Sequence, residues 1–301
     1  MDPTPLITGI GYCGMDYLCR VPYIPLDDKV ELVESLIQGG GPCATAVVAA
    51  ARLGARTAFC GAVGDDARGE QILRGLADEG VDTQGVKVRR GAESPAGFCW
   101  IEQQSGKRSI AWTRGSVRPL GPREIDRDLI AKSHVLHLDG HQTQAALAAA
   151  KIARANGVAV SLDAGTIVPG IDGLLARCDV IIASEKFAAR YTGESNPRKA
   201  LKKLFAGPCR FAAVTRGKEG SVGFDGKTYL PCPAFRVEAV DTTGAGDVYH
   251  GAFAYAYARG KEWAACMRFA AAVAALKCTA FGGRTGIPDL KKTERFLRKQ
   301  P

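Results

Sequence analysis

The 301-residue sequence lacks the patterns that mark several common classes of protein. Its ten cysteines include no C-x-x-C pair and no tandem spacing typical of zinc sites, so we expect reduced, buried thiols rather than disulfides. No uninterrupted apolar run is long enough to span a membrane. The N-terminal M-D-P-T-P-L-I-T-G has no basic stretch followed by a long apolar core, so no export signal is evident. These absences predict a cytoplasmic protein.

Two phosphate-binding fingerprints are also missing. The sequence contains neither G-x-x-x-x-G-K-[ST] nor G-x-G-x-x-G, which argues against a P-loop and against a dinucleotide-dependent redox enzyme. Aromatic residues make up only 7%, and the basic residues behind the net charge of +9 are scattered, so nucleic acid is not an expected partner. The densest basic run, 291–299, predicts the exposed face of a last helix rather than a binding arm. A mildly basic surface still favours anionic substrates such as nucleotides.

Short apolar runs alternate with alanine-rich helical stretches along the chain. Helices are predicted at Pro42–Leu53, Gly69–Glu79 and Gln144–Ala155. The predicted strands are Leu6–Gly11, Thr57–Val63, Val135–Leu138, Val158–Asp163, Val180–Ala183 and Phe211–Thr215. Such repetition is typical of a parallel sheet with helices on both sides, so the predicted fold class is α/β with a three-layer α/β/α core.

Two segments interrupt this rhythm. Residues 17–38 read as extended chain, and residues 96–113 read as a hairpin with its turn at 103–107. Together they predict a small antiparallel sheet that projects from the core as a lid over a site at the carboxyl edge of the parallel strands, with surface decoration as the alternative. We therefore expect one chain, 1–301, with its core formed by 1–16, 39–95 and 114–301.

The stretch D-T-T-G-A-G-D, Asp241–Asp247, places small residues directly before an aromatic- and alanine-rich helix. The backbone N–H groups of Gly244, Ala245 and Gly246 are predicted to point at one spot at the helix start and to bind an anion. Asp247 follows at that spot, where a carboxylate can take a proton from a hydroxyl. An anion site beside a base is what phosphoryl transfer to an alcohol requires. The alternative is a glycine-rich helix cap in which Asp247 stabilises only the first turn.

Three motifs together resemble those of a known family. D-T-T-G-A-G-D is similar to the C-terminal signature of the ribokinase-like (PfkB) carbohydrate kinases. Q-G-G-G-P at 38–42, leading into A-T-A-V-V-A-A-A-R-L-G-A, resembles their N-terminal di-glycine signature, and V-T-R-G-K-E-G at 214–220 resembles their T-x-G-x-x-G nucleotide loop. Order and spacing fit across nearly the whole chain. The sequence looks nearest to the sulfofructose-kinase branch, through G-G-G-P-x-A-T-A, V-D-T-T-G-A-G-D-V and A-A-L-K-C-T-x-x-G-G-R-x-G-I-P-D.

The resemblance implies a role for each matching residue. Asp247 matches the catalytic base, and Gly244, Ala245 and Gly246 match the anion hole for the transferring phosphoryl group. The acceptor sugar would be bound by Asp16, Gly40, Gly41, Thr45, Asp139 and Lys29. The nucleotide would be bound by Ser184, Thr215, Gly217 and Gly220.

The implied cofactors are ATP with Mg²⁺, and in some members of the family a potassium ion. The carbonyls of Asp241 and Thr243, with backbone near Gly282 and Gly286, lie where those members hold the potassium. The family's N-x-x-E motif, which organises Mg²⁺, appears here as S-E-K-F at 184–187. Its last acid is missing, and Glu185 would substitute by binding the metal through water.

The sequence departs from the family at the acceptor end. Thr45 stands where the signature usually has Asn, which changes the hydroxyl pattern that the site can read. Lys29 matches a lysine of the sulfofructose branch, but Trp112 stands where that branch has Asn. Gly140 stands where it has Arg, and an Arg side chain would be the best bidentate partner for a sulfonate or phosphate. Arg108 and Arg114 are the candidates to compensate. Among the histidines, His141 is the candidate substrate contact.

The sequence therefore predicts an ATP-dependent sugar kinase with a non-phosphorylated sugar as its first-choice acceptor. An anionic sulfo- or phospho-sugar comes next, followed by a nucleoside. A catalytically silent sugar or nucleotide sensor is the alternative of another class, although such a sensor would not need Asp247. No membrane is expected as a partner, and a homodimer formed through the lid is left open.

Overall fold

A nine-stranded sheet forms the centre of this computed structural model, which describes residues 4–104, 106 and 108–300. Part of the predicted turn at 103–107 and the first three residues of the predicted core lie outside the described residues. The strand order is β13-β12-β11-β10-β9-β8-β1-β4-β5, with parallel pairing from β11 to β5 and antiparallel pairing at β12 and β13. The strands are β1 (Leu6–Ile10), β4 (Arg56–Gly64), β5 (Val81–Arg89), β8 (Val135–Leu138), β9 (Ala159–Ala164), β10 (Val180–Ser184), β11 (Phe211–Thr215), β12 (Ser221–Phe224) and β13 (Tyr229–Cys232).

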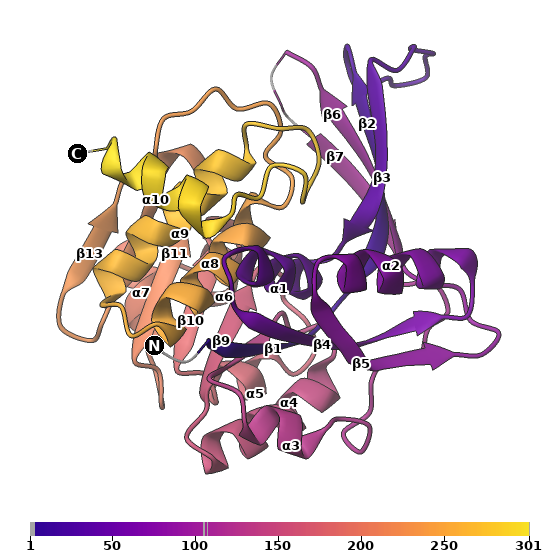
Figure 1. The fold of residues 1–301 in the computed structure, drawn as a ribbon. Helices are drawn as coiled ribbons and strands as arrows, with labels where there is room; N and C mark the ends of the chain where they lie inside the picture. The colour runs from indigo at the N-terminus through magenta and orange to yellow at the C-terminus, as the bar shows by residue number, and fades with distance from the viewer. Residues whose placement is uncertain (1–3, 105, 107, 301) are drawn as a thin grey trace.

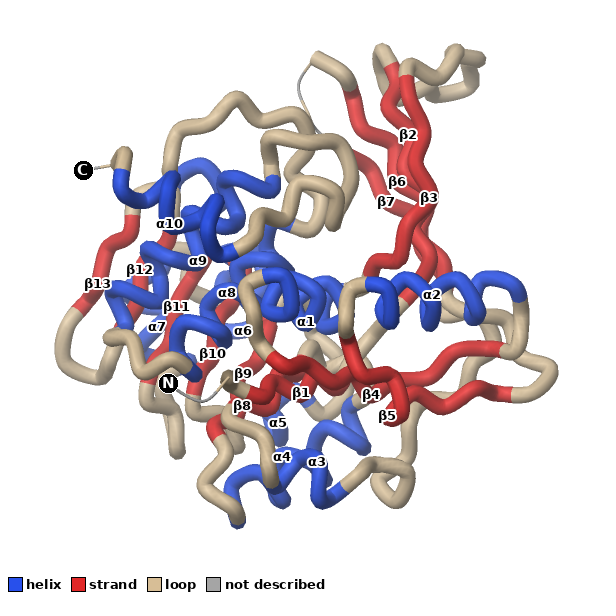
Figure 2. Tube along the Cα trace, viewed as in Figure 1, coloured by secondary structure: helices blue, strands red, loops and turns tan. Residues whose placement is uncertain are grey.

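Helices cover both faces of this sheet (Figures 1 and 2). One face carries α1 (Pro42–Arg52), α2 (Ala67–Asp78), α8 (Ala245–Ala258), α9 (Trp263–Lys277) and α10 (Leu290–Arg298). The other carries α3 (Arg127–Ala131), α4 (Thr143–Ala155), α5 (Ile171–Leu175), α6 (Glu185–Thr192) and α7 (Pro197–Leu204). A short 3₁₀ helix, η1 (Gly217–Glu219), follows β11.

The sequence of β10 shows why the sheet is buried on both sides. Successive side chains of a strand point to opposite faces, and β10 is apolar at every position from Val180 to Ala183. Val180 and Ile182 pack with the α1–α8–α9 layer, while Ile181 and Ala183 pack with the α4–α6 layer. The predicted three-layer arrangement is confirmed, and every strand and helix predicted above is present with small shifts at its ends.

The lid is a four-stranded sheet that rises from one edge of the core (Figure 1). Its order is β3-β2-β6-β7, formed by β2 (Gly14–Val21), β3 (Glu34–Gly40), β6 (Ala96–Glu102) and β7 (Arg108–Thr113). The β2–β3 and β6–β7 pairs are antiparallel, and they are joined by a parallel β2–β6 pairing that the sequence did not indicate. The inner face of the lid, with Leu18, Cys99 and Ile101, packs on Phe281 of the core.

The strand order places a crevice next to β1. The chain moves from β1 to β4 and β5 on one side, and later returns to β8 and β9 on the other. In open α/β sheets, ligands bind outside the carboxyl ends of the strands at such a switch point. The lid stands at this edge, since β2 follows β1 directly.

The described residues contain no helix that is both long and apolar enough to cross a membrane. All ten cysteines are free thiols, and nine of them are buried.

Candidate active site

The loop before α8 turns sharply at Gly244, the residue that precedes the helix. Gly244 has φ +74°, and a Cβ atom there would lie 2.8 Å from the carbonyl oxygen of Gly283, so only glycine fits without strain. Gly246, in the first turn, is exposed, has no positive φ, and would have no heavy atom within 4 Å of an added Cβ. The start of α8 therefore borders open space at Gly246, whereas the N–H of Ala245 already donates to the carbonyl oxygen of Thr242 at 3.2 Å.

Asp247 lies in the same first turn and is only partly exposed. Burial, followed by the negative charge of Asp163, raises the pKa of Asp247 to about 7 against the opposing effect of His250 and Arg108. A carboxylate whose pKa lies near neutral pH is suited to act as a general base.

Asp163 and His250 form a buried pair in direct contact, and both affect the pKa of Asp247. The ring Nε2 of His250 lies 3.2 Å from Oδ1 of Asp163, near the end of β9. Burial alone would raise the pKa of Asp163, but His250 more than offsets this and the pKa of Asp163 lies below its usual value.

Asp16 faces the site from the lid. It lies on β2 between Gln38 of β3 and Gly97 of β6, and Trp112 of β7 continues the same row. Burial raises the pKa of Asp16 to about 6, partly opposed by Arg284. An added Cβ at Gly40 would collide with the Asp16 carboxylate, so only glycine at position 40 allows this position of the carboxylate.

Arg284 is a buried charge behind the di-glycine segment. Its Nη2 donates to the carbonyl oxygen of Gly40 at 3.1 Å, and its Nε donates to Oγ1 of Thr45 at 3.2 Å. Burial lowers the pKa of Arg284 to about 10, and the nearby Asp16 carboxylate acts in the opposite direction. The hydroxyl of Thr45 therefore accepts from a protein guanidinium, and Gly41, with φ +99°, starts α1 beside it.

Asp139 joins three segments at the crevice beside β1. Its Oδ2 accepts from the backbone N–H groups of Tyr12 at 2.8 Å and Cys43 at 3.2 Å, and its Oδ1 accepts from that of His141 at 2.9 Å. The side chain is buried. Asp139 thus fixes the start of α1, and its predicted contact with substrate stays a prediction.

An aromatic group borders the same crevice. The ring of Tyr12 lies 5.8 Å from that of Trp112 and 5.4 Å from that of His141. Arg114 stacks over Trp112 at 5.1 Å and lies 3.3 Å from Nδ1 of His141. The indole of Trp112 is half exposed and stands edge-on to the rings of Tyr12 and His141, at interplanar angles of 84° and 77°.

The predicted nucleotide residues meet at the ends of two neighbouring strands. Ser184 of β10 pairs in register with Thr215 of β11. The Ser184 hydroxyl accepts from the N–H of Phe187 and caps α6. Gly217 and Gly220 both have positive φ, and together they form the tight loop of η1.

Glu185, the predicted metal contact, lies at the start of α6 with half of its side chain exposed. Its Oε1 is 3.3 Å from Nε of Arg216 in the nucleotide loop. The described residues contain no cluster of three or more side chains that could hold a metal ion by themselves.

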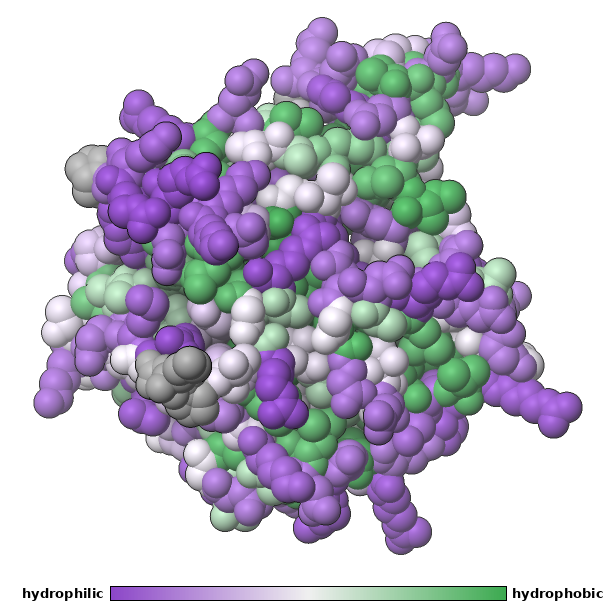
Figure 3. Space-filling view, viewed as in Figure 1, coloured by the Kyte–Doolittle hydropathy of each residue, from purple (hydrophilic) through white to green (hydrophobic). Residues whose placement is uncertain are grey.

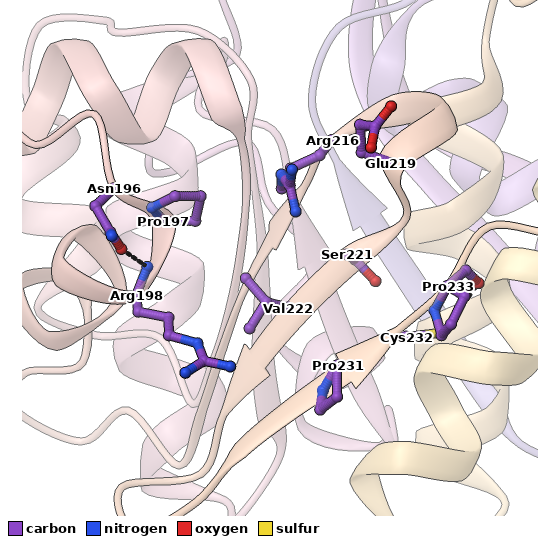
Figure 4. A pocket seen from close by; sticks show the side chains of 10 residues that line it. All are labelled: Asn196, Pro197, Arg198, Arg216, Glu219, Ser221, Val222, Pro231, Cys232 and Pro233. Carbon is purple, nitrogen blue, oxygen red and sulfur yellow. Dashed lines mark hydrogen bonds between the residues drawn. The ribbon is translucent and has the colours of Figure 1, made fainter.

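A cavity of about 410 Å³ opens beside the nucleotide loop (Figure 4). Arg216 and Glu219 line it from the loop, and Val222 and Pro231 line it from β12 and β13. Asp247 and Asp16 are not among its lining residues, so this cavity lies apart from the acceptor end of the site.

The loop of Asp241–Gly244 is held from two sides. Nζ of Lys277 donates to the carbonyl oxygen of Asp241 at 2.9 Å. From the lid, Nη1 of Arg108 donates to Oγ1 of Thr242 at 2.8 Å. A lid residue therefore contacts the segment that forms the predicted anion site.

The fold places Lys29 far from Asp16. It lies in the exposed connection between β2 and β3 at the tip of the lid (Figure 1). The strand from Asp16 to Val21 alone spans about 17 Å. The predicted acceptor residues thus separate into a group near Asp247 and one distant lysine.

Comparison with known proteins accounts for this arrangement. Residues 6–290 match the family described as "pfkB family carbohydrate kinase". The chain belongs to the PfkB family. It is 30% identical over 302 aligned residues to a ribokinase of Haemophilus influenzae, covering 97% of this chain and 98% of the relative.

Two further comparisons widen the range of relatives. A nucleoside kinase of Methanothermobacter thermautotrophicus is 26% identical, with 94% of this chain and 92% of the relative covered. The structure of Arabidopsis thaliana ribokinase complexed with ribose and ATP superposes with a TM-score of 0.87 at 26% identity, covering 98% of this chain and 99% of that one. The predicted family and ribokinase-like fold are confirmed, and the chain is an ATP-dependent kinase of a sugar or nucleoside.

Membership of the sulfofructose-kinase branch stays a prediction. The PfkB chain also has four charged site residues whose contacts sequence reasoning did not predict. Asp163 is the last residue of a predicted strand, and Asp139 directly follows one. This position at a strand end was the only sign in the sequence that Asp163 belongs to the site. Lys277 is a lysine within an alanine-rich helix, which is an unusual place for a charge. Arg284 lies in the quoted G-G-R motif, and Arg108 was considered only as a charge for an anionic acceptor.

Proposed function

We propose that this PfkB chain transfers the γ-phosphoryl group of ATP to a hydroxyl of a small neutral sugar, with Asp247 as the base. The observation that carries the proposal is the first turn of α8. There a carboxylate with a pKa near 7 stands next to the open space at Gly246, and the charge of Asp16 on the lid contributes to raising that pKa. Gly244, Ala245 and Gly246 would stabilise the charge on the transferring phosphoryl group.

Each residue of the site would have a separate task. Asp16, whose carboxylate fits beside Gly40 and Gly97, would accept hydrogen bonds from sugar hydroxyls. Asp247 would take the proton of the attacking hydroxyl. Arg108 would hold the lid against Thr242 and thereby exclude water from the reacting groups.

ATP would lie toward the ends of β10 and β11. Ser184, Thr215, Gly217 and Gly220 are grouped there, and Gly217 and Gly220 leave the backbone open to the nucleotide. Mg²⁺ commonly binds through one or two carboxylates together with substrate phosphates and water, so the single exposed Glu185 fits as a contact through water. Bound with ATP, Mg²⁺ supplies neutralisation of the phosphate charge.

The preference for a neutral acceptor rests on where positive charge is found. Lys29 lies at the lid tip, and Gly140 has φ +82° and no side chain to offer an anionic group. Arg284, the buried guanidinium, is engaged by Gly40 and Thr45. A sulfo- or phospho-sugar would therefore depend on Arg108 and Arg114 alone.

A nucleoside is the second candidate acceptor, and the aromatic group favours it. Tyr12, Trp112 and His141 cluster beside Asp16, and a base could stack on the exposed indole of Trp112 while its ribose met the carboxylate. Under this alternative, Trp112→Ala should raise the KM for the nucleoside several-fold and leave the KM for a free sugar unchanged.

An ADP-release assay across neutral sugars, sulfo- and phospho-sugars and nucleosides tests the proposal. We expect the highest kcat/KM with a neutral sugar. A clear preference for an anionic acceptor would contradict the neutral assignment. Tight ATP binding without ADP release on any acceptor would support a silent sensor instead.

We also propose a homodimer formed through the outer face of the lid. Tyr17 and Phe98 stack there at 5.1 Å, and Phe98 and Ile37 are 42% and 58% exposed. Figure 3 shows hydrophobic surface on the lid. Exposed apolar patches of this kind mark interaction sites. Light scattering should give twice the chain mass, and Phe98→Glu should give the monomer; a monomeric wild type would refute the proposal.

A further inference from the structure

A fully buried lysine lies behind the loop that leads to the predicted anion site. Lys277 is the last residue of α9, and its exposed fraction is 0%. The eight residues of the helix before it, Phe269–Leu276, are all apolar and mostly alanine. Burying an ammonium group costs free energy unless polar partners compensate it, so this lysine needs a reason to be there.

The partners of Lys277 are in the Asp241–Gly244 loop. Its Nζ donates to the carbonyl oxygen of Asp241 at 2.9 Å. The Asp241 carboxylate accepts from the N–H of Thr243 at 2.8 Å and from that of Gly282 at 2.9 Å. The N–H groups of Val240 and Asp241 donate to the carbonyl oxygen of Cys278. One ammonium and one carboxylate thus tie the loop before α8 to the segment after α9.

Electrostatics connects the same groups. Burial lowers the pKa of Lys277, and the negative charge of Asp241 opposes this shift. The carboxylate of Asp241 is itself buried. A cation next to it balances its charge in a region that water does not reach.

The potassium site implied by the family resemblance would use the same loop. It would draw on the carbonyl oxygens of Asp241 and Thr243 and on backbone near Gly282 and Gly286. Here the carbonyl of Asp241 already accepts from an ammonium, and an added Cβ at Gly286 would collide with the carbonyl of Lys277. A potassium ion bound at the same carbonyl would be repelled by the resident positive charge. The residues present therefore do not fit a potassium ion.

We propose that the ammonium group of Lys277 takes the place of the monovalent cation, so that catalysis by this chain does not depend on K⁺. Lys277 is a positioning residue: it holds the carbonyl of Asp241 and so fixes the loop that presents Gly244–Gly246 to the phosphoryl group. The inference rests on the proposed kinase reaction for its kinetic consequence, but its effect on the fold can be measured without an acceptor.

The first test uses the wild-type protein. ADP release is measured in KCl, NaCl and choline chloride at equal ionic strength. We expect kcat and the KM for ATP to agree within two-fold in the three salts. A kcat at least five-fold higher in KCl than in choline chloride would overturn the proposal, and this result requires no variant to fold.

The second test replaces Lys277 with two uncharged residues of different size. Lys277→Ala removes the charge and leaves space, whereas Lys277→Met removes the charge and fills the space. We expect kcat to fall at least ten-fold in both variants, with the KM for the acceptor little changed. KCl or NH₄Cl should restore most of the activity of the alanine variant and little of the methionine variant. Full activity of Lys277→Met, or an alanine variant that no cation rescues, would overturn the proposal.

Thermal unfolding provides a readout that needs no acceptor. KCl should raise the Tm of Lys277→Ala above its value in choline chloride, and should leave the wild-type Tm unchanged. Leu276→Ala is the matched control, because it also opens space beside the end of α9 without removing a charge, and KCl should not raise its Tm. If no acceptor is phosphorylated, the proposed function is wrong. If KCl does not raise the Tm of Lys277→Ala, or raises the Tm of the wild type or of Leu276→Ala as well, the inference about Lys277 is wrong.

Discussion

Replacing Asp247 with asparagine should remove the proposed base and at the same time stabilise the folded protein. The pKa of Asp247 is raised from 3.8 to about 7, mainly by burial. A carboxyl group with a raised pKa keeps its stabilising contribution below the unfolded value and loses it as the pH rises through the folded value. The wild type therefore loses stability between about pH 4 and pH 7.

The size of this effect follows from the shift. The difference between 3.8 and about 7, at 1.36 kcal/mol per unit, corresponds to about 4 kcal/mol. For a chain of 301 residues the entropy of unfolding is roughly 0.6 kcal/mol per degree. The Tm of Asp247→Asn should therefore exceed that of the wild type by up to about 6 °C above pH 7, and by little at pH 4.

Activity should change in the opposite direction. Loss of a general base lowers kcat by roughly 10²–10⁴-fold, while ATP binding should persist because the N–H groups of α8 are unchanged. Calorimetry at pH 4.5 and pH 8 and a kinetic assay measure both effects. An Asp247→Asn variant that is less stable than the wild type at pH 8, or that keeps more than a third of the wild-type turnover, would refute the reasoning.

Asp66→Asn is the matched control of opposite sign. Asp66 caps α2, and although burial raises its pKa, hydrogen bonds from Ser94 and Gly69 lower it to about 2. Its contribution is present above about pH 4 and is lost as the pH falls toward 2. Asp66→Asn should therefore lower the Tm at pH 8 and leave kcat nearly unchanged.

Three shorter predictions concern the same site. Gly246→Val should fold normally, because space is open there, but should lose most turnover. Gly244→Val should instead reduce the Tm, because Gly244 has a positive φ. A fully active Gly246→Val would contradict the anion site. Asp163→Asn removes a negative charge that raises the pKa of the base, so the acid limb of the kcat/KM profile should move to lower pH; a limb that stays in place would exclude this charge effect. Asp16→Ala should raise the KM for a neutral sugar at least ten-fold without changing the KM for ATP, and equal rises in both would assign Asp16 a general structural role.

The sequence by itself determined the features whose causes are local. Alternating apolar runs and alanine-rich helices predicted the layered α/β core, since strands such as Val180–Ala183 are apolar at every position. The small residues before α8 predicted a helix start open to an anion, because glycine at Gly244 permits a backbone that other residues avoid. These properties depend on neighbours in the chain, and a single sequence contains them.

Tertiary structure alone decided which distant charges meet. Arg284 donates to the hydroxyl of Thr45 across 239 residues, and the predicted contact of Thr45 with the sugar stays a prediction. Strand register placed Asp16 beside Gly97, and the length of β2 put Lys29 beyond its reach. Nothing in local spacing reports that Lys277 would reach the carbonyl of Asp241, because the partners of a buried ammonium group are supplied by several segments that only the fold brings together.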